Sequence, residues 1–478
     1  SARNADFEVL SDNPSKPAMK GEDISLEFDL LSNTADISPE RAGVASLSFP
    51  YAQMKTSLSE AFWDLEDSVV TMLKSPNVDI KDSYFYSTKP ELDSLAFSAA
   101  QASYDINTFE LQIAGIPYII VSDAKITPEN GETTILKDSE LLPFNNAEIV
   151  IDTLNEYHYL FNGNIKIQSR KSFEGDATYK LVNAEEDSFN IKFESFELQE
   201  VPVGKKKTQL MTVSGGEITE SDQVEVSAGF KYKGSVTMYA YKEPLELQGL
   251  VQLETESFGN DYNKWIQYER DGEENEVAIA FETAVYENGE AVNAGLHFDI
   301  RGDLYPSLLG DRRDISDIDF FTPKGTLRYD LDNTYYQIET SSKTKGETYE
   351  GTTFIYDDKS QEMIFEGLVD FSKSQNKGFD MRTSVLGTGN AKDQTYAMDV
   401  TALINYDIHP SIPDIMALDF VDLLDRIGLS PSHDNSIQMM YKLANLIGDE
   451  STRAYEEKSH RNYTQLEDAA RELPVTLG

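Results

Sequence analysis

The stretch Trp63-Asp64-Leu65 carries a pattern that the chain repeats, and this pattern decides the fold class. An apolar residue, Met72, follows nine positions after the aromatic residue, and Ala61 precedes it by two positions. The same arrangement recurs at Tyr104-Asp105-Ile106 with Ile113 and at Tyr329-Asp330-Leu331 with Ile338, and a degenerate copy runs from Tyr356-Asp357 to Phe365. A repeated spacing identifies a structural unit before any fold is assumed.

The unit has the composition of a strand, a polar turn and a second strand. We therefore expect hairpins over residues 60–73, 102–113, 327–338 and 354–365. Residues 57–73 also carry apolar side chains at helical spacing, and periodicity alone does not separate a short strand pair from a helix. The copies at Tyr104 and Tyr329 share the register without a helical stripe, which favours the hairpin for the first copy.

The repeat places an acidic residue directly after its aromatic residue. These repeat residues are Trp63, Asp64, Tyr104, Asp105, Tyr329 and Asp330. An enzyme needs one site, whereas a repeat needs the same turn each time. An Asp at a strand end accepts hydrogen bonds from the following main-chain N–H groups. We therefore expect structural roles for the three Asp residues, and we assign no catalytic and no cofactor-binding residue.

Composition narrows the class of protein. The chain has 478 residues, with 84 acidic and 41 basic side chains and a net charge of −43. Such a charge repels nucleic acid and anionic lipid head groups, so we expect no nucleic-acid partner. Absence of Cys excludes disulfides, thiolate zinc sites and cysteine nucleophiles. No apolar run approaches the roughly 20 residues of a membrane-spanning helix, so we expect no transmembrane segment.

The order of segments indicates a mainly β protein: an elongated β-repeat of stacked hairpins, jelly-roll or solenoid-like, followed by a small α-helical C-terminal tail. We divide it into a polar tail (1–22), a β-repeat region (23–200), a second β-repeat region (201–409) and a helical tail (410–478). The abrupt polar start is typical of a fragment of a larger protein.

The tail carries apolar stripes at helical spacing over residues 414–428 and 435–447, and a third, charged helix over 453–473. Each of the first two should bury one face against the end of the β region. For the first helix we expect four apolar side chains to point inward: Leu418, Val421, Leu424 and Ile427.

One acidic loop is a candidate calcium site. Its carboxylates are Asp311, Asp314, Asp317 and Asp319. Hard oxygen ligands in a flexible loop suit Ca²⁺. The loop also contains Arg312-Arg313 and lacks the spacing of an EF-hand, so a solvated acidic surface is the alternative explanation.

Two resemblances add to these observations. The stretch from Gly115-Ile116-Pro117-Tyr118 to Gly175, together with Lys233–Met238, resembles large cell-envelope proteins of Bacteroidota, a family without a settled activity. The repeat unit, best seen from Tyr356 to Phe371, is similar to the OstA/LptA-like periplasmic lipopolysaccharide-transport proteins. These resemblances imply a location in the periplasm or on the cell surface of a Gram-negative bacterium.

We therefore interpret the chain as a non-enzymatic cell-envelope β-repeat module, structural or partner-binding, with a protein or an envelope lipid or glycan as partner. One alternative is an OstA/LptA-like carrier of lipid or lipopolysaccharide, which needs an apolar groove. A second alternative is a carbohydrate-active enzyme on a β scaffold, which needs a cleft with two facing carboxylates.

Overall fold

The computed structural model describes residues 1–41, 43–183, 185–203, 207–255, 257, 264–270, 276–310, 312–371, 379–406, 411–426 and 436–459. The protein is mainly β, with 53% of its residues in strands and 12% in helices, as the sequence predicts. Contacts divide the chain into two compact units. The first contains residues 1–222, 233–248 and 269–273, and the second contains 223–232, 249–268 and 274–478.

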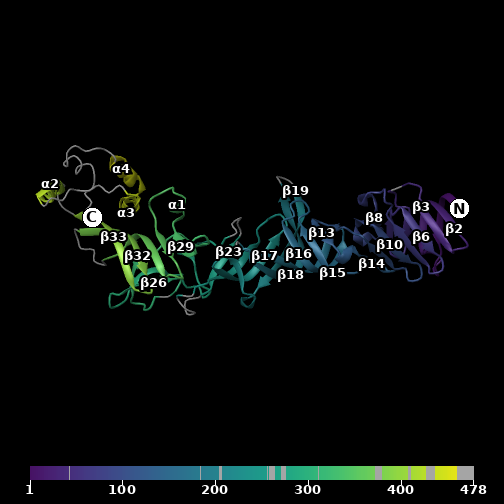
Figure 1. Cartoon of the computed structure of the whole chain (residues 1–478), viewed down its shortest axis with the longest axis horizontal. Coiled ribbons are helices and arrows are strands. Elements are labelled where there is room, and N and C mark those ends of the chain that lie inside the picture. The colour runs from purple at the N-terminus through teal and green to yellow at the C-terminus, as the bar shows by residue number, and fades with distance from the viewer. Residues whose placement is uncertain are drawn as a thin grey trace. The chain divides into compact units, whose positions relative to one another are not determined.

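Sheet A has twelve strands in the order β14-β11-β10-β7-β6-β3-β2-β4-β5-β8-β9, with β1 paired to β2 (Figure 1). Its strands are β1 (Ala2–Val9), β2 (Met19–Asp29), β3 (Thr34–Pro39), β4 (Leu47–Phe49), β5 (Met54–Thr56), β6 (Glu60–Asp64), β7 (Val69–Leu73), β8 (Tyr84–Ser87), β9 (Ala96–Ser98), β10 (Gln101–Asp105), β11 (Leu111–Ala114) and β14 (Thr133–Ile135).

Sheet B has eleven strands in the order β12-β13-β15-β16-β17-β18-β19-β21-β22-β23, with β20 paired to β21. Its strands are β12 (Ile119–Val121), β13 (Ala124–Thr127), β15 (Phe144–Ile151), β16 (His158–Ser169), β17 (Ser172–Val182), β18 (Ser188–Val203), β19 (Lys207–Ile218), β20 (Val224–Ser227), β21 (Phe230–Tyr239), β22 (Glu246–Leu253) and β23 (Ile266–Arg270).

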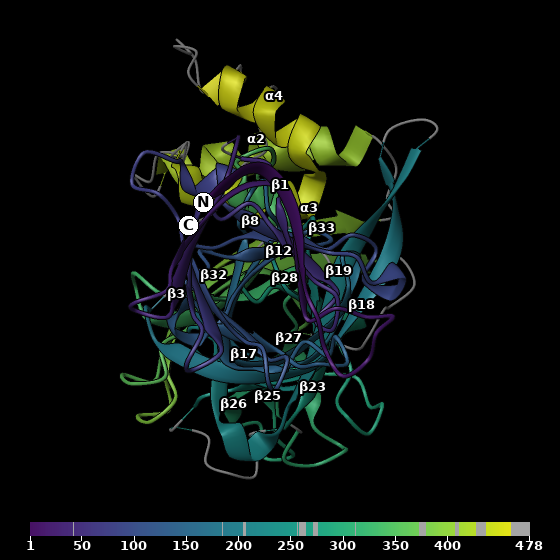
Figure 2. The ribbon, with the colours of Figure 1, turned by 90° about the vertical axis from the view of Figure 1, so that its right-hand side faces the viewer.

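Sheet C has seven strands, and a small sheet of three strands, β26-β25-β27, accompanies it in the second unit. Sheet C contains, in order, β24 (Ile279–Ala280), β28 (Thr326–Asp330), β29 (Tyr335–Glu339), β30 (Thr353–Tyr356), β31 (Glu362–Val369), β32 (Phe379–Asn390) and β33 (Thr395–Tyr406). The small sheet contains β25 (Ala294–Phe298), β26 (Leu304–Leu308) and β27 (Ile318–Phe321), which lie close together in Figure 2. The helices are α1 (Ser341–Thr344), α2 (Ser411–Arg426), α3 (Ile437–Ile447) and α4 (Asp449–Ser459).

The four hairpins expected from the repeated pattern are all present, and the helical alternative for residues 57–73 is wrong. In each hairpin, the residue two positions before the aromatic residue pairs with the apolar residue nine positions after it. These pairs are Ala61 with Met72, Ala102 with Ile113, Leu327 with Ile338, and Phe354 with Phe365. All eight side chains are buried. The nine-residue spacing is therefore the register of one type of hairpin.

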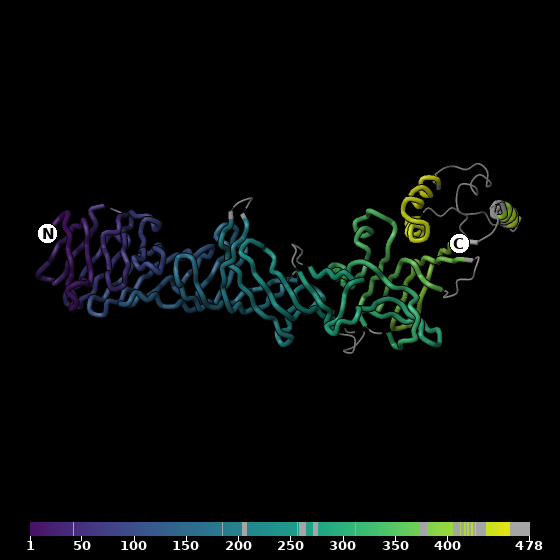
Figure 3. The backbone as a smooth tube through the Cα atoms, turned by 180° about the vertical axis from the view of Figure 1, so that it is seen from behind, coloured from purple at the N-terminus to yellow at the C-terminus, as the bar shows by residue number. Residues whose placement is uncertain are grey.

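Three further hairpins have the same register, although the sequence pattern above did not include them. They pair Leu26 with Ile37, Ile149 with Leu160, and Gly387 with Met398. In all seven hairpins, the residue four positions after the Asp or Asn at the start of the turn adopts a positive φ. These residues are Asn33, Ser68, Phe109, Glu156, Thr334, Gln361 and Gln394. One local turn geometry thus recurs in both units, along the consecutive strands traced in Figure 3.

Sheet A encloses its own core. The ring of Tyr104 in β10 lies 4.6 Å from the ring of Phe49 in β4, and its hydroxyl donates to the carbonyl of Ala18 at 2.8 Å. Strands β10 and β4 are not neighbours in the sheet, so sheet A must curve until the inner sides of distant strands meet. Burial of these aromatic side chains stabilises the curved sheet.

Sheet C packs its inner side against the small sheet. The ring of Phe321 in β27 lies 6.1 Å from Phe354 and 5.8 Å from Phe365. The Phe365 ring also covers Gly387, where an added Cβ would meet it at 2.1 Å. Only glycine leaves room for this ring, so Gly387 is required by packing.

Helices α3 and α4 cover part of the outer side of sheet C. The second tail helix buries one face against the β region as expected, but it lies on the face of the sheet and not over its end. Met439, Met440 and Leu443 of α3 form a buried cluster with Tyr455 of α4. The Ser436 hydroxyl caps α3 by accepting from the Met439 N–H at 3.2 Å. The third helix is observed as α4, and residues 460–473 of that expectation lie outside the described residues.

The first tail helix differs from expectation. Leu418 is 40% exposed, and its neighbours Ile415 and Met416 are more than half exposed, so the prediction that Leu418 points inward is wrong. The buried surface over sheet C is supplied by α3, whose apolar side chains converge on one face. The side chains of Val421 and Leu424, and all of Ile427, lie outside the described residues.

The expected segment boundaries also differ from the observed elements. The polar tail (1–22) contains β1, which pairs along β2. The boundary at residue 200 falls inside β18, which forms a long hairpin with β19. Polar side chains concealed these strands because hairpin strands with one solvated face carry few apolar residues. Within the described residues, no helix has the length and apolar character needed to cross a membrane.

Candidate functional site

The three acidic repeat residues all serve the turns of their hairpins. An oxygen of Asp64 accepts from the main-chain N–H groups of Glu66 and Asp67 at 2.9 and 3.0 Å. Asp105 and Asp330 accept from the corresponding N–H groups of their own loops. Four more side chains at the same position make the same contacts: Asp29, Asp152, Asp357 and Asn390. The recurring acidic residue is a turn cap, as expected.

The aromatic repeat residues differ among copies. Tyr104 is fully buried, whereas Trp63 and Tyr329 are half-buried. The ring of Tyr329 lies 4.9 Å from that of Tyr336, its direct partner across the hairpin. These rings cover the turn end of each hairpin and form no shared site.

The described carboxylates of the candidate calcium loop all have protein donors. Asp314 accepts from the Ser316 N–H at 2.8 Å and Asp317 from the Asp314 N–H at 2.9 Å. Asp319 pairs with Arg312 at 2.6 Å. Asp311 lies outside the described residues.

The same loop lies beside a serine, a histidine and an aspartate that sequence reasoning did not bring together. His297 Nδ1 lies 2.8 Å from Asp319 Oδ1, and His297 Nε2 lies 2.7 Å from Ser307 Oγ. An ionised carboxylate only accepts, so Nδ1 carries the proton and Nε2 accepts from the serine hydroxyl. These contacts have the connectivity of a nucleophile, a base and an orienting acid.

Burial keeps a substrate from reaching the hydrogen-bonded set of Ser307, His297 and Asp319. Ser307 is 1% exposed and His297 is 0% exposed. Burial also lowers the pKa of His297, although hydrogen bonding to Asp319 opposes the shift. A neutral, fully enclosed imidazole with both nitrogens satisfied is a structural cross-link between β25, β26 and β27. The sequence shows only one His and one Ser on neighbouring strands. This pattern is too sparse to reveal their contact unless the strand pairing is known.

His158 has a similar structural role in the first unit. Its Nε2 donates to the carbonyls of Lys242 and Tyr239, at 2.8 and 3.2 Å. Burial lowers the pKa of His158, so the imidazole is held neutral as a hydrogen-bonded group of the core.

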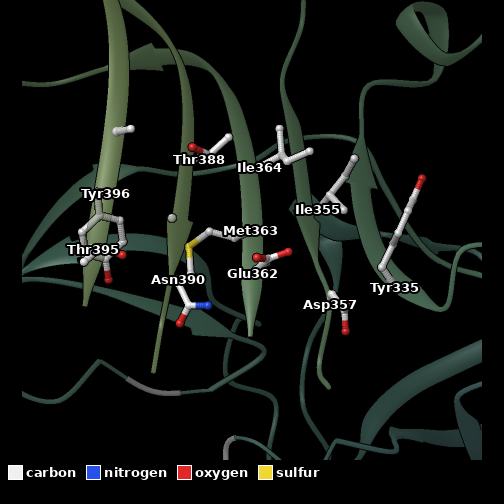
Figure 4. A pocket seen from close by; sticks show the side chains of 12 residues that line it. Tyr335, Ile355, Asp357, Glu362, Met363, Ile364, Thr388, Asn390, Thr395 and Tyr396 are labelled. Carbon is white, nitrogen blue, oxygen red and sulfur yellow. The ribbon is translucent and has the colours of Figure 1, made fainter. Parts of the chain in front are cut away.

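The accessible candidate site is a hollow on the outer side of sheet C, with a volume of about 670 Å³ (Figure 4). Two rows of side chains from adjacent strands line it. The row nearest the turns contains Tyr335, Asp357, Glu362, Asn390 and Thr395. The next row contains Ile355, Ile364, Thr388 and Ala397, which are cross-strand partners in register. This volume lies within the usual range of ligand pockets.

The charged side chains that line the hollow are acidic. Its lining, within the part of the chain that the structure describes, contains two carboxylates and no Lys, Arg or His. Burial opposes ionisation of Asp357, but the N–H groups of Ser360 and Lys359 outweigh it and lower the pKa of this carboxyl. Asp357 is therefore ionised at neutral pH and directed toward its own turn. An anionic ligand would be repelled by these two carboxylates.

The lining also combines apolar and hydrogen-bonding groups. Ile364 is 42% exposed at the centre of the hollow, and Tyr335 stands at one side of it (Figure 4). Glu362 and Thr395 offer carboxylate and hydroxyl groups on neighbouring strands. The amide of Asn390 borders the hollow but is held by its own turn and by the Ser360 carbonyl. A ligand that fits must present both apolar C–H surface and hydrogen-bonding groups.

The adjoining part of the same outer side is closed by helices. Lys343 of α1 forms an ion pair with Glu366 of β31, and both side chains are buried. Lys442 of α3 pairs with Asp399 of β33 at 2.6 Å, with the lysine 1% exposed. Helix α3 therefore sits over β31, β32 and β33 and leaves the turn ends of these strands open.

A smaller hollow of about 310 Å³ lies on sheet A. Its lining is mostly small and polar, and includes Thr71, Ser103, Gln112 and Thr134 from four adjacent strands. It has no exposed apolar centre comparable to Ile364, so it offers a ligand less favourable contact.

Comparisons with known protein families, with curated proteins and with solved structures found no match to this chain.

Proposed function

We propose that the protein is a non-enzymatic binding module of a bacterial cell envelope, and that the hollow on sheet C binds a neutral oligosaccharide. The observation that carries this proposal is the lining: an exposed apolar centre bordered by Tyr335, two carboxylates, an amide and hydroxyls, without a cation. Sugars present C–H faces and many hydroxyl groups, which match this alternation of apolar and polar contacts.

The charge of the hollow disfavours the lipopolysaccharide-carrier alternative. Phosphorylated lipid head groups are anionic, and the charged side chains of the lining, Asp357 and Glu362, are both acidic. The hollow is also open to solvent along a sheet face, whereas acyl chains require an enclosed apolar groove.

The carbohydrate-active enzyme is the second candidate, because Asp357 and Glu362 are cross-strand neighbours that line the same hollow. Their Cβ atoms are therefore about 5 Å apart, a separation typical of directly opposed residues. Asp357 is, however, the turn cap that six other hairpins also have, and its lowered pKa makes it a poor general acid. The pair thus suits hydrogen bonding to sugar hydroxyls better than hydrolysis.

The test is calorimetric titration of the full chain with a panel of neutral oligosaccharides. We expect binding by the wild type, and at least a tenfold loss of affinity, about 1.4 kcal/mol, in Tyr335→Ala and Glu362→Gln. Tyr159→Ala is the matched control, because Tyr159 is an exposed tyrosine on β16 in the other unit.

Three outcomes would reject the proposal. Wild-type protein that binds none of the neutral oligosaccharides would reject the ligand class. Shortened sugar products after incubation would identify the enzyme instead. Lipid recovered by extraction and mass spectrometry of the purified protein would identify the carrier.

A further inference from the structure

Strand β33 forms one edge of sheet C. Within the described residues it pairs only with β32, through all twelve of its residues from Thr395 to Tyr406. Its outer edge therefore presents main-chain donors and acceptors that no described strand satisfies. Natural edge strands are commonly protected by Lys, Pro, bulges or short length. Strand β33 contains neither Lys nor Pro, and its pairing with β32 runs without a bulge.

The core of sheet C is also incomplete at this edge. Val385 of β32 is fully buried, whereas its partner Val400 on β33 is 39% exposed. Ile404, on the same side of β33, is 42% exposed. A further strand beside β33 would continue both the hydrogen-bonded ladder and this apolar row.

The charge pattern of β33 allows a second copy of the same strand as the occupant. Asp399 is the only charged residue of the strand, and Lys442 neutralises it from the helical layer. A second copy of β33 can pair with the first across a twofold axis at Thr401. Antiparallel partners point to the same side of a sheet, so Met398 would then face Ile404 of the second copy, and Val400 would face Ala402.

This register also separates the two acidic groups. Asp399 would face Leu403 of the second copy, whereas a shift of the axis to residue 399 would place like charges directly opposite each other. We propose that two copies of this chain associate through antiparallel pairing of β33 with β33, forming a twofold dimer with a continuous sheet.

One strand pair with a single apolar row is at the small end of stable interfaces, and each chain carries a net charge of −43. The dimer should therefore dissociate on dilution and at low ionic strength, because salt screens the repulsion between copies.

The first experiment measures mass in solution by light scattering over a range of protein and salt concentrations. We expect a dimer that weakens as salt is removed, and a monomer at every condition for Val400→Lys and Ile404→Lys. The matched control is Ile364→Lys, which changes a similarly exposed residue away from the edge and should leave the dimer intact. Circular dichroism melts show whether the monomeric variants are folded.

The second experiment uses the absence of cysteine from the chain. Thr401→Cys should form a disulfide-linked dimer on mild oxidation, because this residue faces itself across the axis. Thr388→Cys, on the neighbouring strand, should not.

A wild type that remains monomeric at high concentration and high salt would overturn the proposal. So would a folded Val400→Lys variant that dimerises as the wild type does. If Ile415→Lys in α2 dissociated the dimer while the β33 variants remained dimeric, the interface would lie on the helix. That result would also overturn the proposal.

Discussion

The outer side of sheet C has two halves built on the same strands, and they differ in what covers them. Toward the turns, the rows of Glu362 and Ile364 form an open hollow. Toward the middle of the same strands, Glu366 is buried in an ion pair with Lys343 of α1. Asp399 pairs with the buried Lys442 of α3, and its own side chain stays 65% exposed. Strand β31 carries Glu362 and Glu366 only four residues apart on the same side of the sheet. The covering helices, rather than the sheet, therefore decide that Glu366 is structural and that Glu362 is available to a ligand.

The covered half should dominate stability. Glu366→Ala would leave the ammonium group of Lys343 buried without its partner, and such a loss costs about 3–5 kcal/mol. We expect a large fall in the free energy of unfolding, measured by chemical denaturation. The control is Glu8→Ala, which breaks the exposed ion pair with Lys20 and should cost about 0–1 kcal/mol. If Glu366→Ala and Glu8→Ala lowered the free energy of unfolding equally, the assignment of Glu366 to a buried, stabilising ion pair would be contradicted.

The turn caps should have a smaller effect that is similar in both units. Asp64→Ala and Asp357→Ala each remove a carboxylate that accepts two main-chain N–H groups. We expect each change to cost about 0.5–2 kcal/mol of unfolding free energy, as loss of a local cap does. Asn replacements, which keep the accepting oxygen, should restore most of the loss. An Asp64→Ala variant with the same free energy of unfolding as the wild type would show that the cap is not needed.

The smallest effect concerns the enclosed imidazole, and it depends on pH. Burial lowers the pKa of His297 in the folded state, so the unfolded chain binds a proton more readily below its ordinary pKa of about 6.5. The His297 contribution to stability is thus present above that pH and is lost as the pH falls toward the folded-state pKa. His297→Gln should flatten the pH dependence of unfolding below roughly pH 6.5. An unchanged slope would show that His297 does not titrate as its burial requires.

Much of the fold could be predicted from the sequence because the hairpin is a local unit. The register of Trp63-Asp64 with Met72 depends on one turn geometry, and the same reasoning places Asp357 opposite Glu362. The copy at Phe28-Asp29 has every feature of the pattern and could have been found in the same way. The copies at Ile151-Asp152 and Gly389-Asn390 lack the aromatic residue, so a pattern that begins from an aromatic misses them.

The candidate site could not be predicted, because it depends on contacts between distant segments. Glu362 and Glu366 have the same residue type and lie on the same side of the strand, and only the helices over Glu366 distinguish them. The contacts of His297 with Ser307 and Asp319 require three strands in one register. Leu418 shows the reverse case. Its helix is present as α2, but the side chain is 40% exposed, and α3 supplies the apolar face that packs on sheet C.

One titration of a neutral oligosaccharide against two variants of β31 separates the open half of sheet C from its covered half. Glu362→Gln changes the open half of β31, and Glu366→Gln changes its covered half. We predict that Glu362→Gln binds at least tenfold more weakly than the wild type and has the same melting temperature. Glu366→Gln should melt at a lower temperature, and below that temperature it should bind the sugar as tightly as the wild type does. Equal binding by wild type and a folded Glu362→Gln variant would contradict the account.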